Sequence, residues 1–206
     1  KITTDGVKSL HGFCHSVIPD RIETATYVIA AAATRGNVTI THTNPAHIGH
    51  VLKKIVSAGV SVQCTADTIH VRWTQPLKPV TITTAVFPGF PTDVQAQWMA
   101  LMSLVDGKSA IRETVFENRF LHVAELQRLG ANIRIKGNTV QVTGVKQISG
   151  APVMASDLRA GAALVIAGLI AQGRTEVLRV YHLDRGYECL EKKLRSLGAD
   201  IRRVPQ

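Results

Sequence analysis

Apolar residues recur with helical spacing in three stretches that each end at a glycine. The stretches read LKKIVSAGVSV, VAELQRLGANIRI and LEKKLRSLGADIRR, and their glycines are Gly59, Gly130 and Gly198. Glycine is favoured just after a helix because it adopts the left-handed conformation without strain. Beyond each glycine, apolar and polar residues alternate, as is typical of a strand. The glycines lie 71 and 68 residues apart, which predicts one structural unit used three times.

A second set of glycines follows nearly the same period. Gly36, Gly107 and Gly173 each end an alanine-rich or leucine-rich stretch and begin a β-branched one, in TRGNVTI, VDGKSAI and AQGRTEV. Their spacings are 71 and 66 residues. The pattern of each unit therefore predicts a helix, a strand, a second helix and a second strand. A further strand is expected where enough residues follow before the next unit. We predict an α/β fold built from three βαβαββ-type modules.

The start of the chain is similar to the end of a module. Residues 2–12 (ITTDGVKSLHG) align with residues 140–150 (VQVTGVKQISG) at an offset of 138 residues, two repeat lengths. Residues 1–18 are therefore expected to hold the tail strand of a preceding module. The chain also begins with lysine rather than methionine, so we expect an excised piece of a longer protein, with a processed chain as the alternative.

No linker-like segment separates the units, so they are expected to form one domain over residues 1–206. The predicted modules after the tail strand are 19–86, 87–152 and 153–206. Several helical stretches have apolar faces too wide for a solvated surface helix. Helices inside and sheets outside is therefore the expected packing.

The composition narrows the partners only slightly. The 24 Lys+Arg against 15 Asp+Glu give a formal net charge of +9 at pH 7, which favours an anionic partner. Basic residues are scattered and only 5% of residues are aromatic, with no groove-reading or stacking motif, so nucleic acid is not favoured over a phosphorylated small molecule. A generally basic surface without a specific partner is the plain alternative.

Cysteine and histidine spacing indicates neither a disulfide framework nor a metal site. The three cysteines, Cys14, Cys64 and Cys189, lack paired spacing, and the eight histidines lack the spacing of metal ligands. The longest apolar run is too short to span a membrane, and the start lacks the pattern of a signal peptide. We therefore expect a cytoplasmic protein without membrane insertion or metal.

Sequence motifs carry a resemblance to a known family. They are PDRIET at 19–24, FPTDVQAQ at 90–97, TVFENRF at 114–120, SDLRAG at 156–161 and HLDRGYE at 182–188. In this order, on a repeated scaffold, they resemble the enolpyruvyl transferases, and the ENRF segment favours the branch that acts on UDP-N-acetylglucosamine. The similarity covers essentially the whole chain. The branch that makes 5-enolpyruvylshikimate 3-phosphate remains the alternative within the family.

The resemblance implies a two-domain enzyme in which each domain is an inside-out α/β barrel of three modules, with the active site between them. The implied reaction transfers the enolpyruvyl group of phosphoenolpyruvate to the 3-hydroxyl of UDP-N-acetylglucosamine, the first committed step of peptidoglycan synthesis, without a cofactor. This chain would be the C-terminal half. The family's Lys-Asn pair and reactive cysteine loop would belong to the other half, so the isolated chain is expected to be inactive.

Asp93 is the candidate catalytic base. It lies between Pro91 and an apolar helical stretch, and it matches the family's aspartate that contacts the sugar hydroxyl. The alternative is structural, because aspartate just before a helix commonly caps it. Position alone favours the cap, and the FPTD motif favours the catalytic role.

Three arginines and two loop residues are the candidate binding groups. Arg159 and Arg185 match family arginines expected to bind the carboxylate of phosphoenolpyruvate, since guanidinium groups pair with planar anions and keep their charge. The alternative is a structural ion pair with the neighbouring Asp157 or Asp184. In the TVFENRF loop, the resemblance assigns sugar-nucleotide contacts to Phe116, Arg119 and the backbone amide of Val115, although Phe116 alone would be assigned to the core.

Two other functions remain open from the residues alone. A stand-alone basic domain of repeated α/β modules would bind nucleic acid with a steep dependence on salt. A regulatory or structural paralogue would have lost catalysis, and the joint presence of Asp93, Arg159 and Arg185 argues against it.

Overall fold

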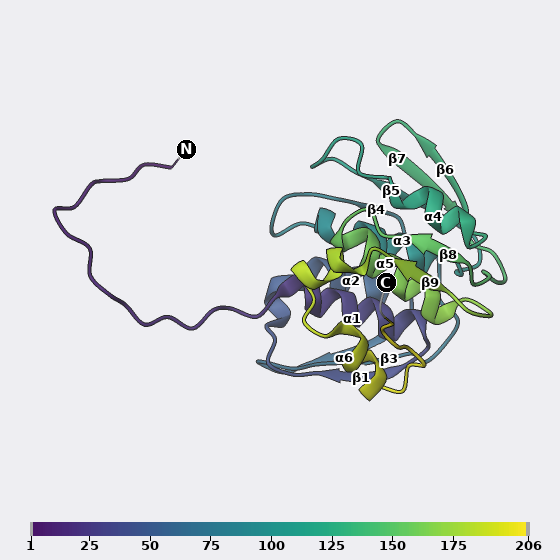
Figure 1. Cartoon of the computed structure of the whole chain (residues 1–206), viewed down its shortest axis with the longest axis horizontal. Helices are drawn as coiled ribbons and strands as arrows, with labels where there is room; N and C mark the ends of the chain where they lie inside the picture. The colour runs from purple at the N-terminus through teal and green to yellow at the C-terminus, as the bar shows by residue number, and fades with distance from the viewer. Residues whose placement is uncertain (1, 205–206) are drawn as a thin grey trace.

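The computed structural model describes residues 2–204, which form alternating helices and short strands (Figure 1). The α-helices are α1 (Arg21–Ala33), α2 (Gly49–Ser57), α3 (Gln95–Met102), α4 (His122–Arg128), α5 (Leu158–Ile170) and α6 (Leu190–Ser196). The strands are β1 (Asn37–Ile40), β2 (Ser61–Cys64), β3 (Ile69–Arg72), β4 (Ile82–Thr83), β5 (Lys108–Arg112), β6 (Asn132–Lys136), β7 (Thr139–Thr143), β8 (Pro152–Met154) and β9 (Glu176–Leu178). Three 3₁₀ helices complete the fold: η1 (Pro45–Ile48), η2 (Thr92–Val94) and η3 (Val180–Arg185).

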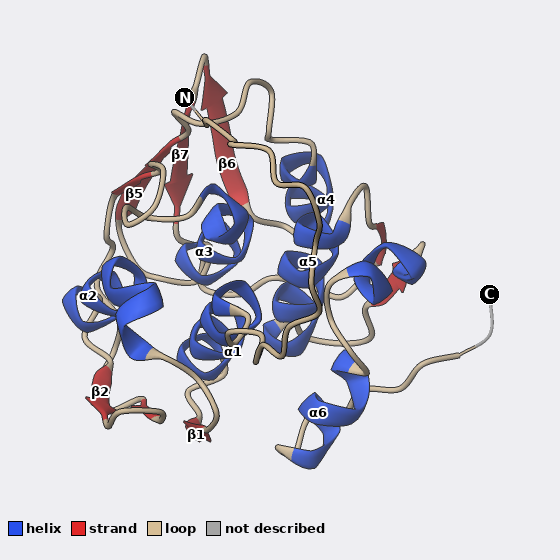
Figure 2. Cartoon of the chain, turned by 90° about the vertical axis from the view of Figure 1, so that its left-hand side faces the viewer, coloured by secondary structure: helices blue, strands red, loops and turns tan. Residues whose placement is uncertain are grey.

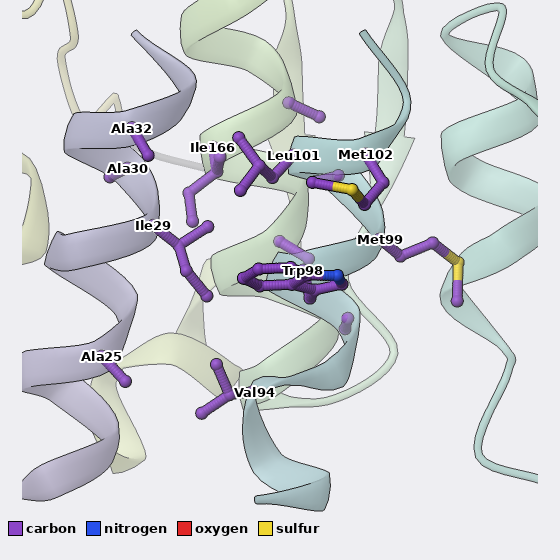
Figure 3. Close-up of a cluster of buried hydrophobic side chains, with 14 of the residues drawn as sticks. Ala25, Ile29, Ala30, Ala32, Val94, Trp98, Met99, Leu101, Met102 and Ile166 are labelled. Atoms are coloured by element: carbon purple, nitrogen blue, oxygen red, sulfur yellow. The ribbon is translucent and has the colours of Figure 1, made fainter. Parts of the chain in front are cut away.

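Three helices, one from each predicted module, form the centre of the molecule. Figure 2 shows α1, α3 and α5 side by side, with the strands toward the outside. Every residue of α3 is buried. Its sequence, QAQWMALM, has no charged residue, as expected for a helix that other elements cover on all sides. Around it pack side chains such as Ile29 of α1 and Ile166 of α5 (Figure 3). The predicted α/β class and the packing with helices inside are confirmed.

The strands form separate small sheets around these helices. The first sheet has the order β1-β3-β2, the second β4-β5-β7-β6, and the third consists of β8 and β9. In the first two sheets the central strand, β3 or β7, is antiparallel to both neighbours. Within residues 2–204 the strands do not close into a barrel. The structure is therefore a helical core covered by three separate sheets that are not joined to one another.

The first set of repeated glycines occupies equivalent positions. Gly59, Gly130 and Gly198 have φ of +101°, +100° and +97° and end α2, α4 and α6. The amide after each glycine donates to the carbonyl five residues earlier, as in Val60 N to Ile55 O at 3.3 Å, and each glycine amide donates to the carbonyl three residues earlier. These two bonds define the Schellman motif. The threefold repeat therefore extends to the hydrogen bonds of the helix caps.

The second set of glycines is less uniform. Gly107 and Gly173 have φ of +111° and +86°, whereas Gly36 does not have a left-handed backbone. In the first module the left-handed residue is instead Arg35, with φ of +57°. All three modules thus have a left-handed residue after the central helix, but in the first module this residue comes one position earlier, at Arg35.

Two expected strands are absent. Residues 2–12 form no strand, and the segment leaves the body as an exposed extended arm (Figure 1). Residues 199–203, which follow Gly198 with an alternating pattern, form no strand either. The physical reason is the same in both cases, because a strand is stabilised by a partner strand and neither segment has one among residues 2–204. The module boundaries themselves remain a prediction.

The helices of residues 2–204 include none long and apolar enough to cross a membrane.

Candidate functional site

Asp93 lies close to the place where the other two modules have an aspartate that caps the central helix. In the flanking modules, Asp20 accepts hydrogen bonds from the Ile22 and Glu23 amides, and Asp157 accepts from those of Arg159 and Ala160. By the repeat spacings of 71 and 66 residues, the position equivalent to Asp20 and Asp157 is Pro91, the residue just before η2. Asp93 lies two residues later, within η2, and its side chain caps neither η2 nor α3. The capping alternative for Asp93 is therefore not what the structure has.

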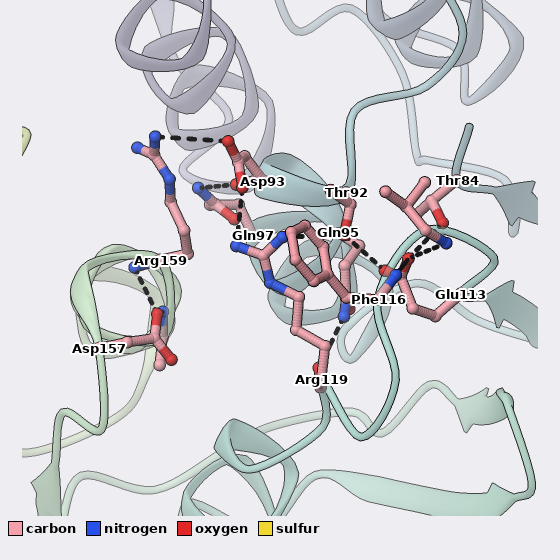
Figure 4. Close-up of polar contacts among 12 residues, drawn as sticks. Thr84, Thr92, Asp93, Gln95, Gln97, Glu113, Phe116, Arg119, Asp157 and Arg159 are labelled. Carbon is pink, nitrogen blue, oxygen red and sulfur yellow. Dashed lines mark hydrogen bonds and ion pairs between the residues drawn. The ribbon is translucent and has the colours of Figure 1, made fainter. Parts of the chain in front are cut away.

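The Asp93 carboxylate instead lies between two guanidinium groups (Figure 4). Its Oδ1 is 2.7 Å from Arg119 Nη2, and its Oδ2 is 3.6 Å from Arg159 Nη2. The Asp93 side chain is 33% exposed, so a ligand can reach it, while those of Arg119 and Arg159 are 26% and 15% exposed. Three side chains that the sequence placed in the site are thus brought together. They come from η2, the loop after β5 and the first turn of α5.

A buried carboxylate that sequence reasoning missed organises the neighbouring loop. Glu113 accepts hydrogen bonds from the Val115 and Phe116 amides at 2.8 and 3.1 Å and from the hydroxyls of Thr84 and Thr92 at 2.7 and 2.8 Å (Figure 4). Burial raises the pKa of Glu113, but these hydrogen bonds outweigh burial and hold its pKa below the ordinary value. The ionised Glu113 therefore fixes the loop that carries the predicted sugar-nucleotide contacts.

The same loop is linked to Asp93. The Arg119 Nη1 atom donates to the Thr92 hydroxyl at 2.9 Å, and the Arg119 guanidinium lies 4.9 Å from the ring centre of Phe116. The side-chain amide of Gln95 holds the Arg119 carbonyl at 2.8 Å. Hydrogen bonds thus run from Glu113 through Thr92 and Arg119 to Asp93, so the loop and the carboxylate share one arrangement.

Beneath Asp93, a buried polar cluster joins the three central helices. The hydroxyls of Thr26 and Tyr187 lie 3.0 Å apart, and Gln97 Nε2 donates to both, at 3.2 and 3.3 Å. The same Gln97 amide lies 3.1 Å from the Asp93 carbonyl oxygen, and Arg159 Nη1 lies 3.3 Å from the Tyr187 hydroxyl. This cluster positions both Asp93 and Arg159. Its members are far apart in sequence, and no local motif marks them.

The remaining predicted site residues are placed differently. Arg185, at the end of η3, is exposed and forms no ion pair with any residue in 2–204. The Val115 amide, expected to contact a ligand, donates to Glu113. The suggested structural pairs are also absent, because Asp157 caps α5 and Asp184 binds Arg203 at 2.6 Å. The ligand-binding roles of Arg185 and Val115 stay predictions.

His122 lies at the base of a hollow of about 270 Å³ that Phe116, Arg119 and Asp157 also line. Burial lowers the pKa of His122 to about 4; the Asp157 charge opposes this and the Arg119 charge adds to it. The His122 ring is therefore neutral near pH 7. Its Nε2 atom is buried and has no hydrogen-bond partner among residues 2–204. In the described part of the chain, no three His, Cys, Asp or Glu side chains gather as metal ligands would.

The fold and the sequence are those of a known class of protein. The family model of EPSP synthase (3-phosphoshikimate 1-carboxyvinyltransferase) matches residues 1–194. The chain therefore belongs to this family of carboxyvinyl transferases. Among curated proteins, it is 60% identical over 201 residues to the UDP-N-acetylglucosamine 1-carboxyvinyltransferase of Endomicrobium trichonymphae, covering 98% of this chain and 48% of that protein. The enzyme of the same name from Desulfosudis oleivorans is 55% identical, with 99% and 49% covered. The chain spans about half the length of these relatives.

Solved structures agree with the family. The enolpyruvyl transferase NikO from Streptomyces tendae superposes with a TM-score of 0.80 at 33% identity, over 90% of this chain and 44% of that one. EPSP synthase from Acinetobacter baumannii superposes with a TM-score of 0.72 at 17% identity, over 92% of this chain and 44% of that one, which supports the fold alone.

Proposed function

We propose that the chain is the C-terminal half of an enzyme that transfers the enolpyruvyl group of phosphoenolpyruvate to the 3-hydroxyl of UDP-N-acetylglucosamine. The enzyme would act in the cytoplasm, in peptidoglycan synthesis. Support for this acceptor comes from three relatives, 54–60% identical, that carry the corresponding name. A shikimate-type acceptor is less favoured, because the solved EPSP synthase is only 17% identical.

Asp93 is the observation that carries the proposal. The aspartates just before the other two central helices, Asp20 and Asp157, cap those helices, whereas the Asp93 carboxylate caps no helix and lies partly exposed between two arginines. In the proposed reaction, Asp93 accepts the proton of the sugar hydroxyl while the hydroxyl oxygen attacks C2 of phosphoenolpyruvate. At the same time, C3 of phosphoenolpyruvate gains a proton. Loss of phosphate and of a C3 proton from the resulting tetrahedral adduct then gives the enolpyruvyl ether.

The arginines suit the anionic part of this chemistry. Arg159 is mostly buried and fixed by Tyr187, so its guanidinium is preorganised for a carboxylate or phosphate. Arg119 approaches from the opposite side of Asp93. Arg185 is the proposed third cation, and its side chain would have to turn toward the site when the substrates bind. The second half of the enzyme would supply the remaining groups, so this chain alone should release no phosphate.

The test is Asp93→Asn in the complete enzyme with its N-terminal half restored. We expect phosphate release to fall by about two to four orders of magnitude, the usual contribution of a general base, with little change in the thermal melt. Asp20→Asn is the matched control, because asparagine caps a helix as well as aspartate does and activity should persist. Near-normal turnover of Asp93→Asn would remove Asp93 from the mechanism. Measuring each acceptor separately also decides between the amino sugar and shikimate 3-phosphate.

A further inference from the structure

The outer face of the second sheet carries an array of positive charges. The inward side chains Ile111, Ile133 and Val140 are buried against the helices, so the alternate residues of β5, β7 and β6 (Figure 1) face solvent. Strand pairing arranges these outward residues in three rows, which are Lys108–Thr143–Asn132, Ala110–Gln141–Arg134 and Arg112–Thr139–Lys136. The rows contain two lysines, two arginines and no acidic residue. We refer to these four cations, Lys108, Arg112, Arg134 and Lys136, as the basic face.

The basic face is not neutralised within residues 2–204. All four of its side chains are exposed, and the ion pairs of the described chain involve other residues. Glu113 follows Arg112, but its carboxylate is buried and accepts hydrogen bonds from the hydroxyls of Thr84 and Thr92. Asp106, which precedes β5, forms no ion pair with the face. The sheet thus gathers basic residues that are scattered along the chain and presents their charges without compensation.

The fold does not require these charges. The first sheet has the same strand arrangement, and Arg72 is the one lysine or arginine in the corresponding outward rows of β1, β3 and β2. By the offset of 71 residues between the first two modules, all four cations replace uncharged polar residues, which are Asn37, Thr41, Gln63 and Thr65. The basic face is therefore a property of the second module and not of the repeated scaffold.

Protection of a sheet edge explains only part of this pattern. Lysine and arginine on an edge strand hinder pairing with another sheet, and the edge strand β6 carries Arg134 and Lys136. However, β5 lies between β4 and β7, and it carries Lys108 and Arg112. Because both strands contribute two cations, the pattern favours a partner that meets the face as a whole.

We propose that the basic face binds the surface of a membrane rich in anionic phospholipids, without insertion. Arg112 and Lys136 are separated by two strand spacings, about 10 Å, and Lys108 and Arg112 by four residues of β5, about 14 Å. Four cations distributed over a flat face in this way can all contact a plane of negative charge at once. The headgroups of anionic phospholipids provide such a plane and attract clustered lysine and arginine.

A nucleic acid suits this face less well. A DNA duplex is a cylinder, so a flat face would meet its phosphates along one line rather than over an area. Proteins commonly bind single strands through aromatic side chains that stack on bases, and the three outward rows contain none. We therefore assign the basic face to lipid. This assignment does not depend on the reaction proposed for Asp93.

The experiment is cosedimentation of the chain with vesicles. One set of vesicles contains equal parts of phosphatidylglycerol and phosphatidylcholine, and the other contains phosphatidylcholine alone. We expect saturable binding to the anionic vesicles and none to the neutral ones. Binding to the anionic vesicles should be lost at about 1 M salt, where charges are screened beyond about 3 Å.

Two variants with the same net charge locate the binding. The first removes the basic face, through Lys108→Gln, Arg112→Gln, Arg134→Gln and Lys136→Gln. The control removes two lysines and two arginines that are exposed and form no ion pair within residues 2–204, through Lys8→Gln, Arg72→Gln, Arg174→Gln and Lys192→Gln. Each basic residue at an anionic surface contributes about five-fold in affinity, so the first variant should bind at least about ten-fold more weakly than the control.

Two double variants keep the test decisive if the fourfold variant loses its circular dichroism. Lys108→Gln with Arg112→Gln changes β5, and Arg134→Gln with Lys136→Gln changes β6. Each pair should weaken binding by about five-fold or more, because both strands contact the surface.

Three results would overturn the proposal. The first is equal vesicle binding by the control and the variants of the basic face, and the second is no binding of the parent chain to anionic vesicles. The third is tighter binding to a DNA duplex or to polyglutamate than to the vesicles at an equal concentration of negative charge. That result would assign the face to nucleic acid or to an acidic protein segment. None of these readouts requires catalysis.

Discussion

At the scale of single residues, the aspartates that lie just before the three central helices do two different things. Asp20 and Asp157 satisfy free amides at the start of α1 and α5, while Asp93 lies against Arg119 and Arg159. The difference follows from position, because the repeat places Pro91 where the other modules have the capping aspartate, and Asp93 lies two residues later within η2. A residue with a common structural role is thereby made available for chemistry.

His122 gives a prediction about pH. Its native pKa of about 4 lies below the ordinary value of 6.5, so between these pH values the unfolded chain binds more protons than the native one. Stability should therefore be present above pH 6.5 and fall as the pH drops toward 4, by up to about 3 kcal/mol. Thermal or urea unfolding measured from pH 7.5 to 4 tests this expectation.

The variant His122→Leu separates this effect from general acid unfolding. Leucine cannot take up a proton, so the variant should lose less stability than the parent chain over the same interval. His50→Leu removes an exposed histidine and serves as the control, with the pH dependence of the parent. Identical slopes for His122→Leu and the parent would show that His122 is not the group responsible.

The sequence predicted part of the site and missed the rest for a physical reason. Asp93, Arg119 and Arg159 belong to local motifs, and the structure brings these three side chains together, while their roles in catalysis and binding stay predictions. Glu113 and Tyr187 act through contacts between distant segments, such as the Tyr187 hydroxyl with Thr26, 161 residues away. A pattern read along the chain cannot reveal such contacts.

At the scale of elements, the helix ends were the most predictable feature. A glycine after a helix is required by the conformation of one residue and by bonds within six residues, so the local sequence suffices. Strands depended on partners instead, and residues 2–12 and 199–203 have a strand pattern without forming one. The local sequence therefore predicted where helices end, but it did not predict which segments with a strand pattern pair into a sheet.

Gly130 allows the cap to be tested without steric interference. Its φ is +100°, and no atom lies within 4 Å of the place where a Cβ would be added. Gly130→Ala should therefore lower the free energy of unfolding by about 1–2 kcal/mol through backbone strain alone. Gly130→Asn should cost less, because asparagine tolerates the left-handed conformation. In denaturant titrations, Gly12→Ala in the exposed arm is the control, and a cost equal to that of Gly130→Ala would contradict the strain argument.

At the scale of the whole molecule, the three modules share one core. The main cluster joins residues of α1, α3 and α5, including Ile29, Trp98 and Ile166, while a smaller cluster lies under η3 and α6. Since no module buries its own central helix, none has the core that separate folding would require. The repeat in sequence is therefore not a repeat of independent folding units.

Trp98 offers a test of this shared core. It is fully buried in α3, packs edge-on against Phe90 with ring centres 5.5 Å apart, and donates from Nε1 to the Val80 carbonyl at 3.2 Å. Trp98→Ala should lower stability by about 3–5 kcal/mol, because it leaves a large cavity between the central helices. The remaining tryptophan, Trp73, follows β3 in the first module and reports on that module alone. If the core is shared, Trp73 fluorescence and far-ultraviolet circular dichroism should move to the same lower midpoint in urea. A Trp73 midpoint that stays at its original value would show that the first module unfolds by itself.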